Sequence, residues 1–169
     1  MKVVLDIETI QAPREEWARL SGKLPPSAEL ESAGEGYDLF TAGAAEVQRR
    51  AEDEQYAKSA FDATFSQIVC IGLLEFSDHL EPRGSVAWYG GNEKELLKQF
   101  WSRLAQNRPA LFITHNGLGF DLPFLKKRSI IHQVKPSLDI NLAKFRTEPV
   151  YDTMAIWSNW DTRGWVKLD

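Results

Sequence analysis

Four apolar segments of the chain have the length and composition of β-strands. Val3–Glu8 is apolar on both faces at its start, which is typical of a buried central strand. Gln67–Phe76 and Ser85–Tyr89 are separated by a polar turn, so we expect them to pair as an antiparallel hairpin. The fourth segment, Leu111–Thr114, is short and leads into a turn that contains glycine.

Helices are predicted between and after these strands. Asn92 is a residue type that caps helix N-termini, and Glu95 follows at the spacing of a capping box. The apolar residues that come next recur at the helical period: Leu96, Leu97, Phe100 and Leu104. A second helix is expected to begin near Asp121, and a last short helix after Asp152. Residues 132–150 show no clear period.

Residues 11–64 interrupt this order of elements. The segment is rich in Ala, Glu and Arg, and its second half consists of helix formers with weak apolar spacing. We therefore expect a largely helical or mobile insertion within a single domain that spans residues 1–169. The remaining order, strand, hairpin, helix, strand, helix, predicts an α/β fold with a mixed sheet and helices on both faces.

Composition and charge narrow the classes of function. The 169 residues carry 20 Lys and Arg against 24 Asp and Glu, a formal net charge of -4, which argues against nonspecific coating of duplex nucleic acid. The single cysteine, Cys70, excludes a scaffold of internal disulfides. No apolar run reaches the roughly 18 residues that span a bilayer, and the first residues lack the pattern of a signal peptide. We expect a cytoplasmic protein with no membrane partner.

Asp6 and Glu8 lie two positions apart at the end of the first predicted strand. Strand residues two apart project from the same face, and the ends of parallel strands are where α/β sheets place their sites. Paired carboxylates repel one another, so they favour a divalent cation or a shared proton, and oxygen ligands suit Mg²⁺ or Mn²⁺. The alternative is a strand that ends in ordinary polar residues.

Asp121 lies two positions after the turn 116–119, near the start of a predicted helix. The helix dipole favours the ionised carboxylate there, which is the form that binds a cation. The alternative is an aspartate that caps the helix. The basic run 126–128 beyond it also has two interpretations, contact with phosphates of an incoming strand or a solvated helix face.

Two motifs taken together resemble a known family. Val4-Leu5-Asp6-Ile7-Glu8-Thr9 and Asn116-Gly117-x-x-Phe120-Asp121-x-Pro123-x-Leu125 resemble the first two motifs of the DEDD 3′–5′ exonucleases, which have the ribonuclease H-like fold. More narrowly, the sequence resembles predicted exonucleases related to the proofreading domain of family-B DNA polymerases. The segments Ser66–Gly72, Gly91–Leu97 and Tyr151–Met154 agree with this resemblance.

The resemblance implies a set of site residues. Asp6, Glu8 and Asp121 would be the catalytic ligands of two divalent ions, Mg²⁺ or Mn²⁺, with a scissile phosphate between them. The implied partner is the 3′ end of single-stranded nucleic acid. The residues that would contact it are Thr9, Ile10, Asn116 and Phe120. Phe120 would offer a flat surface to a base or sugar, and plain core packing is the alternative for this residue.

One part of the family pattern is missing. The family has a fourth carboxylate on a later helix, four or five residues after a Tyr or His, and no acidic residue after Asp121 has that spacing. Asp152 is interpreted as a helix cap or as an acid behind the ligands. We therefore expect a C-terminally incomplete domain that is weak or inactive as an exonuclease. The alternative is a non-catalytic nuclease-like module that binds nucleic acid ends or a protein partner.

The last stretch of the chain is rich in tryptophan. Trp157, Trp160 and Trp165 make up three of the 6 tryptophans in the sequence. An exposed aromatic surface tends to drive association, so we expect a homo-oligomer or a partner protein to contact this end.

Overall fold

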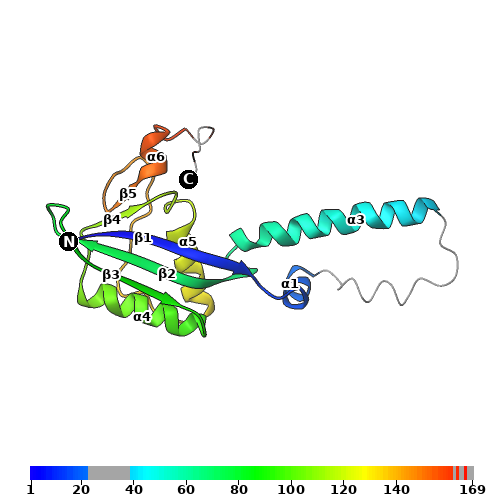
Figure 1. Ribbon diagram of the computed structural model, residues 1–169, viewed down its shortest axis with the longest axis horizontal. Coiled ribbons are helices and arrows are strands. Elements are labelled where there is room, and N and C mark those ends of the chain that lie inside the picture. Colours follow the sequence, from blue (N-terminus) through cyan, green and yellow to red (C-terminus); the bar gives the residue numbers. More distant parts are fainter. Residues whose placement is uncertain (23–38, 162, 164–165, 167–169) are drawn as a thin grey trace. The chain divides into compact units, whose positions relative to one another are not determined.

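The computed structural model describes residues 1–22, 39–161, 163 and 166 (Figure 1). Its contacts divide the chain into two compact units, Met1–Glu8 with Ile68–Asp169, and Thr9–Gln67. Trp165, part of the tryptophan-rich end, lies outside the described residues. Over the part of the chain that is described, no helix combines the length and the apolar character needed to cross a membrane.

A mixed five-stranded sheet has the strand order β3-β2-β1-β4-β5 (Figure 1). The strands are β1 (Lys2–Gln11), β2 (Ser66–Phe76), β3 (Pro82–Tyr89), β4 (Leu111–Thr114) and β5 (Val150–Asp152). β2 and β3 form the predicted antiparallel hairpin, whereas β4 runs parallel to both β1 and β5. The α/β class with a mixed sheet is thus confirmed, and β5 is a strand that the sequence pattern did not predict. The carboxyl ends of β1, β4 and β5 point to the same edge of the sheet.

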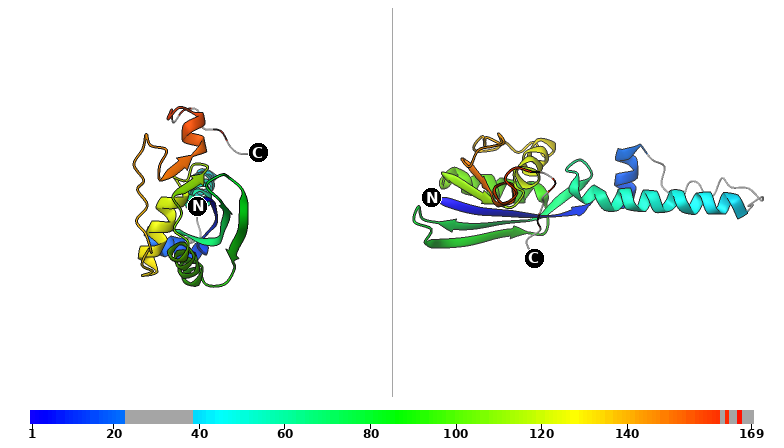
Figure 2. Two further views of the ribbon diagram at one scale, coloured as in Figure 1. Left: turned by 90° about the vertical axis from the view of Figure 1, so that its left-hand side faces the viewer. Right: turned by 90° about the horizontal axis from the view of Figure 1, so that it is seen from above.

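Helices α4 (Glu93–Gln106) and α5 (Asp121–Ile131) pack against one another beside the sheet (Figure 2). Trp101 Nε1 donates a hydrogen bond to Ser129 Oγ over 2.9 Å, which joins the two helices in the core. The short helix α6 (Thr153–Trp157) follows β5 directly. The predicted period of α4 is confirmed by the buried side chains of Leu96, Leu97, Phe100 and Leu104.

The N-terminus of α4 agrees in part with the capping that the sequence predicts. Asn92 is the N-cap, and its side chain accepts a hydrogen bond from the Lys94 backbone N–H over 2.9 Å. Glu95 does not complete a capping box, because its carboxylate accepts a hydrogen bond from Lys98 Nζ over 2.7 Å. The cap is therefore confirmed, and the reciprocal contact is not.

A buried ion pair joins α4, α5 and β2. Arg128 donates to the two carboxylate oxygens of Glu93 over 2.8 and 2.5 Å, and the Ile68 backbone N–H donates to Glu93 over 2.8 Å. Burial opposes the ionisation of Glu93, but these hydrogen bonds outweigh it and hold the pKa of Glu93 below its ordinary value. Arg128 is therefore neither a phosphate contact nor part of a solvated face, the two alternatives that the sequence left open.

The second compact unit is mainly helical, and a contact between two aromatic rings joins its helices. It contains α1 (Arg14–Ser21), α3 (Leu39–Lys58) and the 3-10 turn η1 (Ser59–Phe61). Trp17 meets Tyr56 edge to face, with ring centroids 5.5 Å apart. The Tyr56 hydroxyl donates to the Ala12 carbonyl over 2.9 Å, which ties α3 to the segment before α1.

Candidate functional site

The end of β1 presents two carboxylates on one face of the sheet. Leu5 and Ile7 are buried, whereas Asp6 and Glu8 between and after them are exposed. This alternation is the one expected for a strand with one buried face. The two acids therefore project from the same face, as the sequence indicates.

The turn between β4 and α5 leads to the third predicted ligand. Asn116 has a left-handed backbone, with φ 62°, and its carbonyl accepts a hydrogen bond from Phe120 N over 2.8 Å. A Cβ atom on Gly117 would lie 2.4 Å from Thr114 Cβ, so the turn needs glycine at this close approach. Asp121 is the first residue of α5.

The Asp121 carboxylate lies against β1. Its side chain is buried, at 3% exposure, and Oδ1 accepts a hydrogen bond from the Ile7 backbone N–H over 3.2 Å. Burial raises the pKa of Asp121 to about 6, and the charges of Asp6 and Asp152 act in the same direction. Asp121 and Asp6 are thus close enough to repel. The capping alternative is wrong, because Phe120 is the N-cap of α5 and no side chain caps it.

Asp152 holds the turn in place from the end of β5. One carboxylate oxygen accepts hydrogen bonds from the backbone N–H groups of Asn116, Met154 and Ala155 over 2.9, 3.1 and 3.3 Å. The other accepts from Leu118 N over 2.9 Å. The prediction that Asp152 caps the last helix is confirmed. The contacts of Asp152 with the turn were missed, because the sequence does not predict β5, the strand that brings Asp152 beside this turn.

Glu8 stays exposed on the strand face that it shares with Asp6. Within the described ranges, no group of three or more His, Cys, Asp or Glu side chains could hold a metal ion. The charge of Asp6 acts on Asp121, and Glu8 is not among the groups that shift the pKa of Asp121.

The carboxylate pair of Asp6 and Asp121 suits a hard cation. Among the residues that the structure describes, neither acid forms an ion pair with Lys, Arg or His. Two neighbouring carboxylates without a compensating charge favour a divalent ion, and their oxygen atoms are the donors that Mg²⁺ and Mn²⁺ prefer. The chemistry of the donor set therefore fits the expected metal.

Two of the predicted nucleic-acid contacts belong to the second compact unit. Thr9 and Ile10 continue β1 into the unit Thr9–Gln67. Thr9 Oγ1 donates a hydrogen bond to the Ala60 carbonyl over 2.9 Å, and Ile10 is exposed. The hydroxyl of Thr9 therefore has a structural partner within its own unit.

The other two predicted contacts lie in the turn before Asp121. Asn116 is half-buried, and its carboxamide has no hydrogen-bond partner among the described residues. The ring of Phe120 is also half-buried and packs against Phe124, with centroids 5.2 Å apart. Phe120 thus packs against its neighbour and keeps an exposed part, and its contact with a base or sugar stays a prediction.

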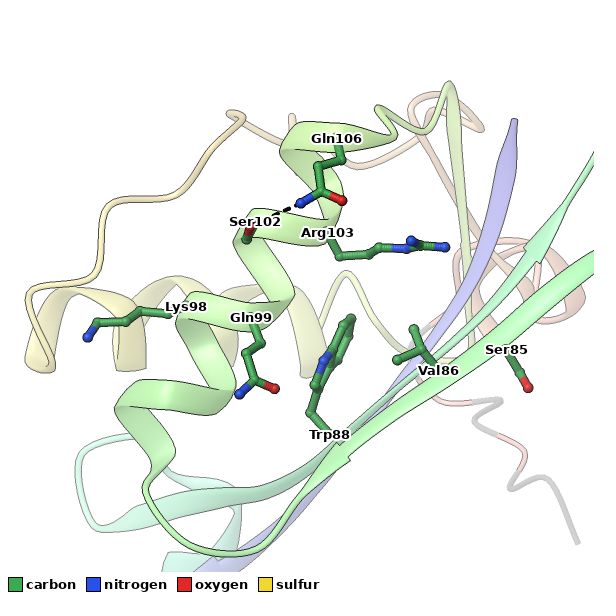
Figure 3. Close-up of a pocket in the computed structure, with 8 residues that line it drawn as sticks. All are labelled: Ser85, Val86, Trp88, Lys98, Gln99, Ser102, Arg103 and Gln106. Atoms are coloured by element: carbon green, nitrogen blue, oxygen red, sulfur yellow. Dashed lines mark hydrogen bonds between the residues drawn. The ribbon is translucent and has the colours of Figure 1, made fainter.

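A groove of the first unit contains none of these residues. It lies between β3 and α4 and has a volume of about 640 Å³ (Figure 3). Its lining residues are Ser85, Val86, Trp88, Lys98, Gln99, Ser102, Arg103 and Gln106. Arg103 forms an ion pair with Glu75 over 2.7 Å. The candidate site consequently rests on the acids at the carboxyl edge of the sheet.

More than half of the chain matches a protein family. Residues 59–168 match the family described as predicted 3′–5′ exonucleases related to the exonuclease domain of PolB. The matched range contains Asn116, Phe120 and Asp121 and begins after Asp6 and Glu8.

DNA polymerases are among the curated relatives and solved structures to which the chain is similar. The chain is 39% identical over 44 residues to a catalytic subunit of DNA polymerase epsilon from Arabidopsis thaliana, which is 26% of this chain and 2% of that protein. It is 31% identical over 78 residues to the corresponding catalytic subunits of Debaryomyces hansenii and Dictyostelium discoideum, which is 46% of this chain and 3% of each relative. The chain therefore spans a few per cent of the length of these relatives. The family B DNA polymerase from the archaeon Pyrobaculum calidifontis matches with a TM-score of 0.43 and 13% identity, over 82% of this chain and 12% of that chain.

Proposed function

The chain belongs to the family of predicted 3′–5′ exonucleases related to the exonuclease domain of PolB, and we propose that Asp6, Glu8 and Asp121 form its site for phosphodiester hydrolysis. The observation that supports this proposal is the position of Asp121. Its carboxylate accepts a hydrogen bond from Ile7 N, the backbone group between the two acids of β1. Residues 113 positions apart in sequence thus contribute acids to one edge of the sheet.

Each acid has a separate part in the proposed site. Asp6, Glu8 and Asp121 would hold two divalent ions, Mg²⁺ or Mn²⁺, which supply an activated water and stabilise the charge that develops on a scissile phosphate. The exposed side chains of Asp6 and Glu8 are accessible to a substrate, whereas Asp121 is held by the β1 backbone. Asp152 positions Asp121 through the turn that it fixes.

The proposed substrate is the 3′ end of single-stranded nucleic acid. Thr9, Ile10, Asn116 and Phe120 remain the proposed contacts. Of these, Asn116 has a carboxamide without a hydrogen-bond partner among the described residues, which a nucleotide can use as both donor and acceptor.

We expect these 169 residues by themselves to cleave slowly or not at all. The family's fourth carboxylate follows a Tyr or His by four or five positions, and no acid after Asp121 does so.

Mn²⁺ binding by calorimetry tests the proposed ligands. Asp6→Asn and Asp121→Asn should weaken binding by at least about tenfold, because each removes a charged ligand. Asp139→Asn is the matched control, since the Asp139 side chain is 94% exposed and pairs only with Lys126 among the described residues. Unchanged Mn²⁺ affinity in both ligand variants would refute the site.

Digestion of 5′-labelled single-stranded DNA and RNA with Mn²⁺ tests the activity. Slow shortening from the 3′ end, abolished by Asp6→Asn, is the expected result. Rapid shortening that Asp6→Asn abolishes would contradict the expectation of weak cleavage and leave the site in place.

A further inference from the structure

A second, smaller pocket lies beside the turn that carries Asn116. Its volume is about 170 Å³, and its walls come from this turn, from α6 with the residues after it, and from the loop before β5. The residues that matter for its chemistry are Asn116, Lys144, Phe145 and Trp160. A drug-sized ligand needs a pocket of about 300 Å³ or more, so this one suits a single planar ring system.

Two aromatic rings form one side of the pocket. The centroids of Phe145 and Trp160 are 5.2 Å apart, with 46° between the ring planes. Phe145 is 74% exposed, which is unusual for a phenylalanine. Both residues have a left-handed backbone, with φ 62° and 65°. Such a conformation is costly for residues other than glycine and is concentrated at ligand sites.

The loop that carries Phe145 is also basic. Lys144 and Arg146 flank it, and both side chains are exposed. Neither forms an ion pair within the described part of the chain. An aromatic residue between two free cations is the combination that binds single-stranded nucleic acid, because the ring stacks on a base while the cations meet phosphates.

The acids in the pocket wall favour a base there and not a phosphate. Asp152 is buried and accepts four backbone hydrogen bonds, and Asp161 pairs with Arg163 over 3.1 Å. Both carboxylates repel a phosphate. The carboxamide of Asn116, which has no hydrogen-bond partner in the described part of the chain, offers a donor and an acceptor to the edge of a base.

We propose that the pocket is a stacking subsite for one base of single-stranded nucleic acid, with Phe145 and Trp160 as its platform and Lys144 and Arg146 as contacts to the flanking phosphates. The subsite shares Asn116 with the candidate site, so it holds a nucleotide next to the turn that carries Asp121. This inference rests on the proposed function for the identity of the ligand.

Fluorescence anisotropy with the full chain tests the platform. The probe is a fluorescein-labelled single-stranded DNA of about ten nucleotides, within the range that single-strand sites cover, and EDTA prevents cleavage. Phe145→Ala should raise Kd by about 5- to 150-fold, the loss that corresponds to one stacked base. Phe145→Tyr keeps the ring and should change Kd by no more than about twofold.

Trp157→Ala is the matched control on the protein side. Trp157 is 79% exposed on α6 and does not line the pocket, so its loss should leave Kd within about twofold of the parent. A probe with one abasic position supplies the control on the nucleic-acid side. It should bind the parent protein more weakly than the intact probe does, and it should bind Phe145→Ala with the same Kd as the intact probe.

The salt dependence of Kd tests the cations. Arg146→Gln should reduce the slope of log Kd against log salt by about 0.7, the value for one phosphate contact on a single strand. An unchanged Kd in Phe145→Ala, or an equal abasic effect in both proteins, would overturn the subsite. Mn²⁺ binding distinguishes this failure from failure of the proposed function, because it depends on Asp6 and Asp121 and not on Phe145.

Discussion

Asp121 differs from the other two proposed ligands in its environment. Asp6 and Glu8 are exposed, whereas Asp121 is buried against β1 and has its pKa raised to about 6. A buried carboxylate beside another acid destabilises the folded chain when both are ionised. The ionised Asp121 therefore lowers the free energy of unfolding, and a bound cation can offset this loss.

The burial of Asp121 predicts a pH-dependent effect of Asp121→Asn. The unfolded carboxyl group ionises near its ordinary pKa of 3.8 and the folded one at about 6, so its contribution to stability falls as the pH rises from about 4 through about 6. In EDTA, the free energy of unfolding of the variant minus that of the parent should therefore be larger at pH 8 than at pH 4. A difference of about two pKa units sets an upper limit of about 3 kcal/mol on this gain.

Urea denaturation at the two pH values measures the gain. The Asn side chain retains an oxygen that can accept the hydrogen bond from Ile7 N, so packing is preserved. Asp139→Asn, at an exposed position, is the control for the same change of residue type. An equal effect of Asp121→Asn at pH 4 and pH 8 would contradict the raised pKa.

The β4–α5 turn is the element that positions the site. Its shape depends on the left-handed backbone of Asn116 and on the absence of a side chain at Gly117. It also depends on the hydrogen bonds that the backbone N–H groups of Asn116 and Leu118 donate to Asp152. Each of these features sets the direction in which α5 begins. A change in the turn should therefore disturb Asp121 and the packing of α5 together.

Gly117→Ala tests the fit of the turn. The added Cβ would lie 2.4 to 2.6 Å from three side-chain atoms of Thr114, a buried residue of β4 that cannot rotate away. We expect a loss of about 2–3 kcal/mol in the free energy of unfolding and weaker Mn²⁺ binding. Gly84→Ala is the control, because nothing lies within 4 Å of its added Cβ. Similar stability of the two variants would refute the tight contact.

At the scale of the whole molecule, one polar cluster joins the layers of the first compact unit. Glu93 receives hydrogen bonds from Ile68 of β2 and Arg128 of α5, and its carboxylate also meets His132 Nε2 over 2.6 Å. The two helices and the sheet are thereby held in one arrangement. A buried ion pair of this kind is costly to break because the remaining partner keeps its charge without compensation.

Glu93→Gln should lower the free energy of unfolding by about 3–5 kcal/mol, since it leaves Arg128 buried opposite a neutral side chain. Glu95→Gln is the matched control, because Glu95 is also a glutamate in the first turn of α4. Glu95 pairs with Lys98 at the surface, so its loss should cost no more than about 0.5 kcal/mol. Thermal or urea denaturation of both variants measures the difference, and equal losses would show that the Glu93 cluster does not join the layers.

Much of the fold and part of the site could be predicted from the sequence. The alternation around Asp6 indicates a strand with acids on one face, Asn92 indicates a helix start, and the hairpin follows from two apolar strands with a polar turn. The short strand β5 could not be predicted, because three residues carry too little pattern. The capping box at Glu95 failed because a lysine one turn later competes for its carboxylate.

The sequence by itself determined the local features of this protein: the strand and helix periods, the helix caps and the motif residues at the ends of strands. These depend on neighbours along the chain, which a reader of the sequence can see. Only the tertiary structure decided that Asp121 lies against Ile7, that Arg128 is buried with Glu93 and that Phe145 meets Trp160. Each of these pairs joins residues that are distant in sequence, so hydrogen bonding, charge and packing act between them only after the chain has folded.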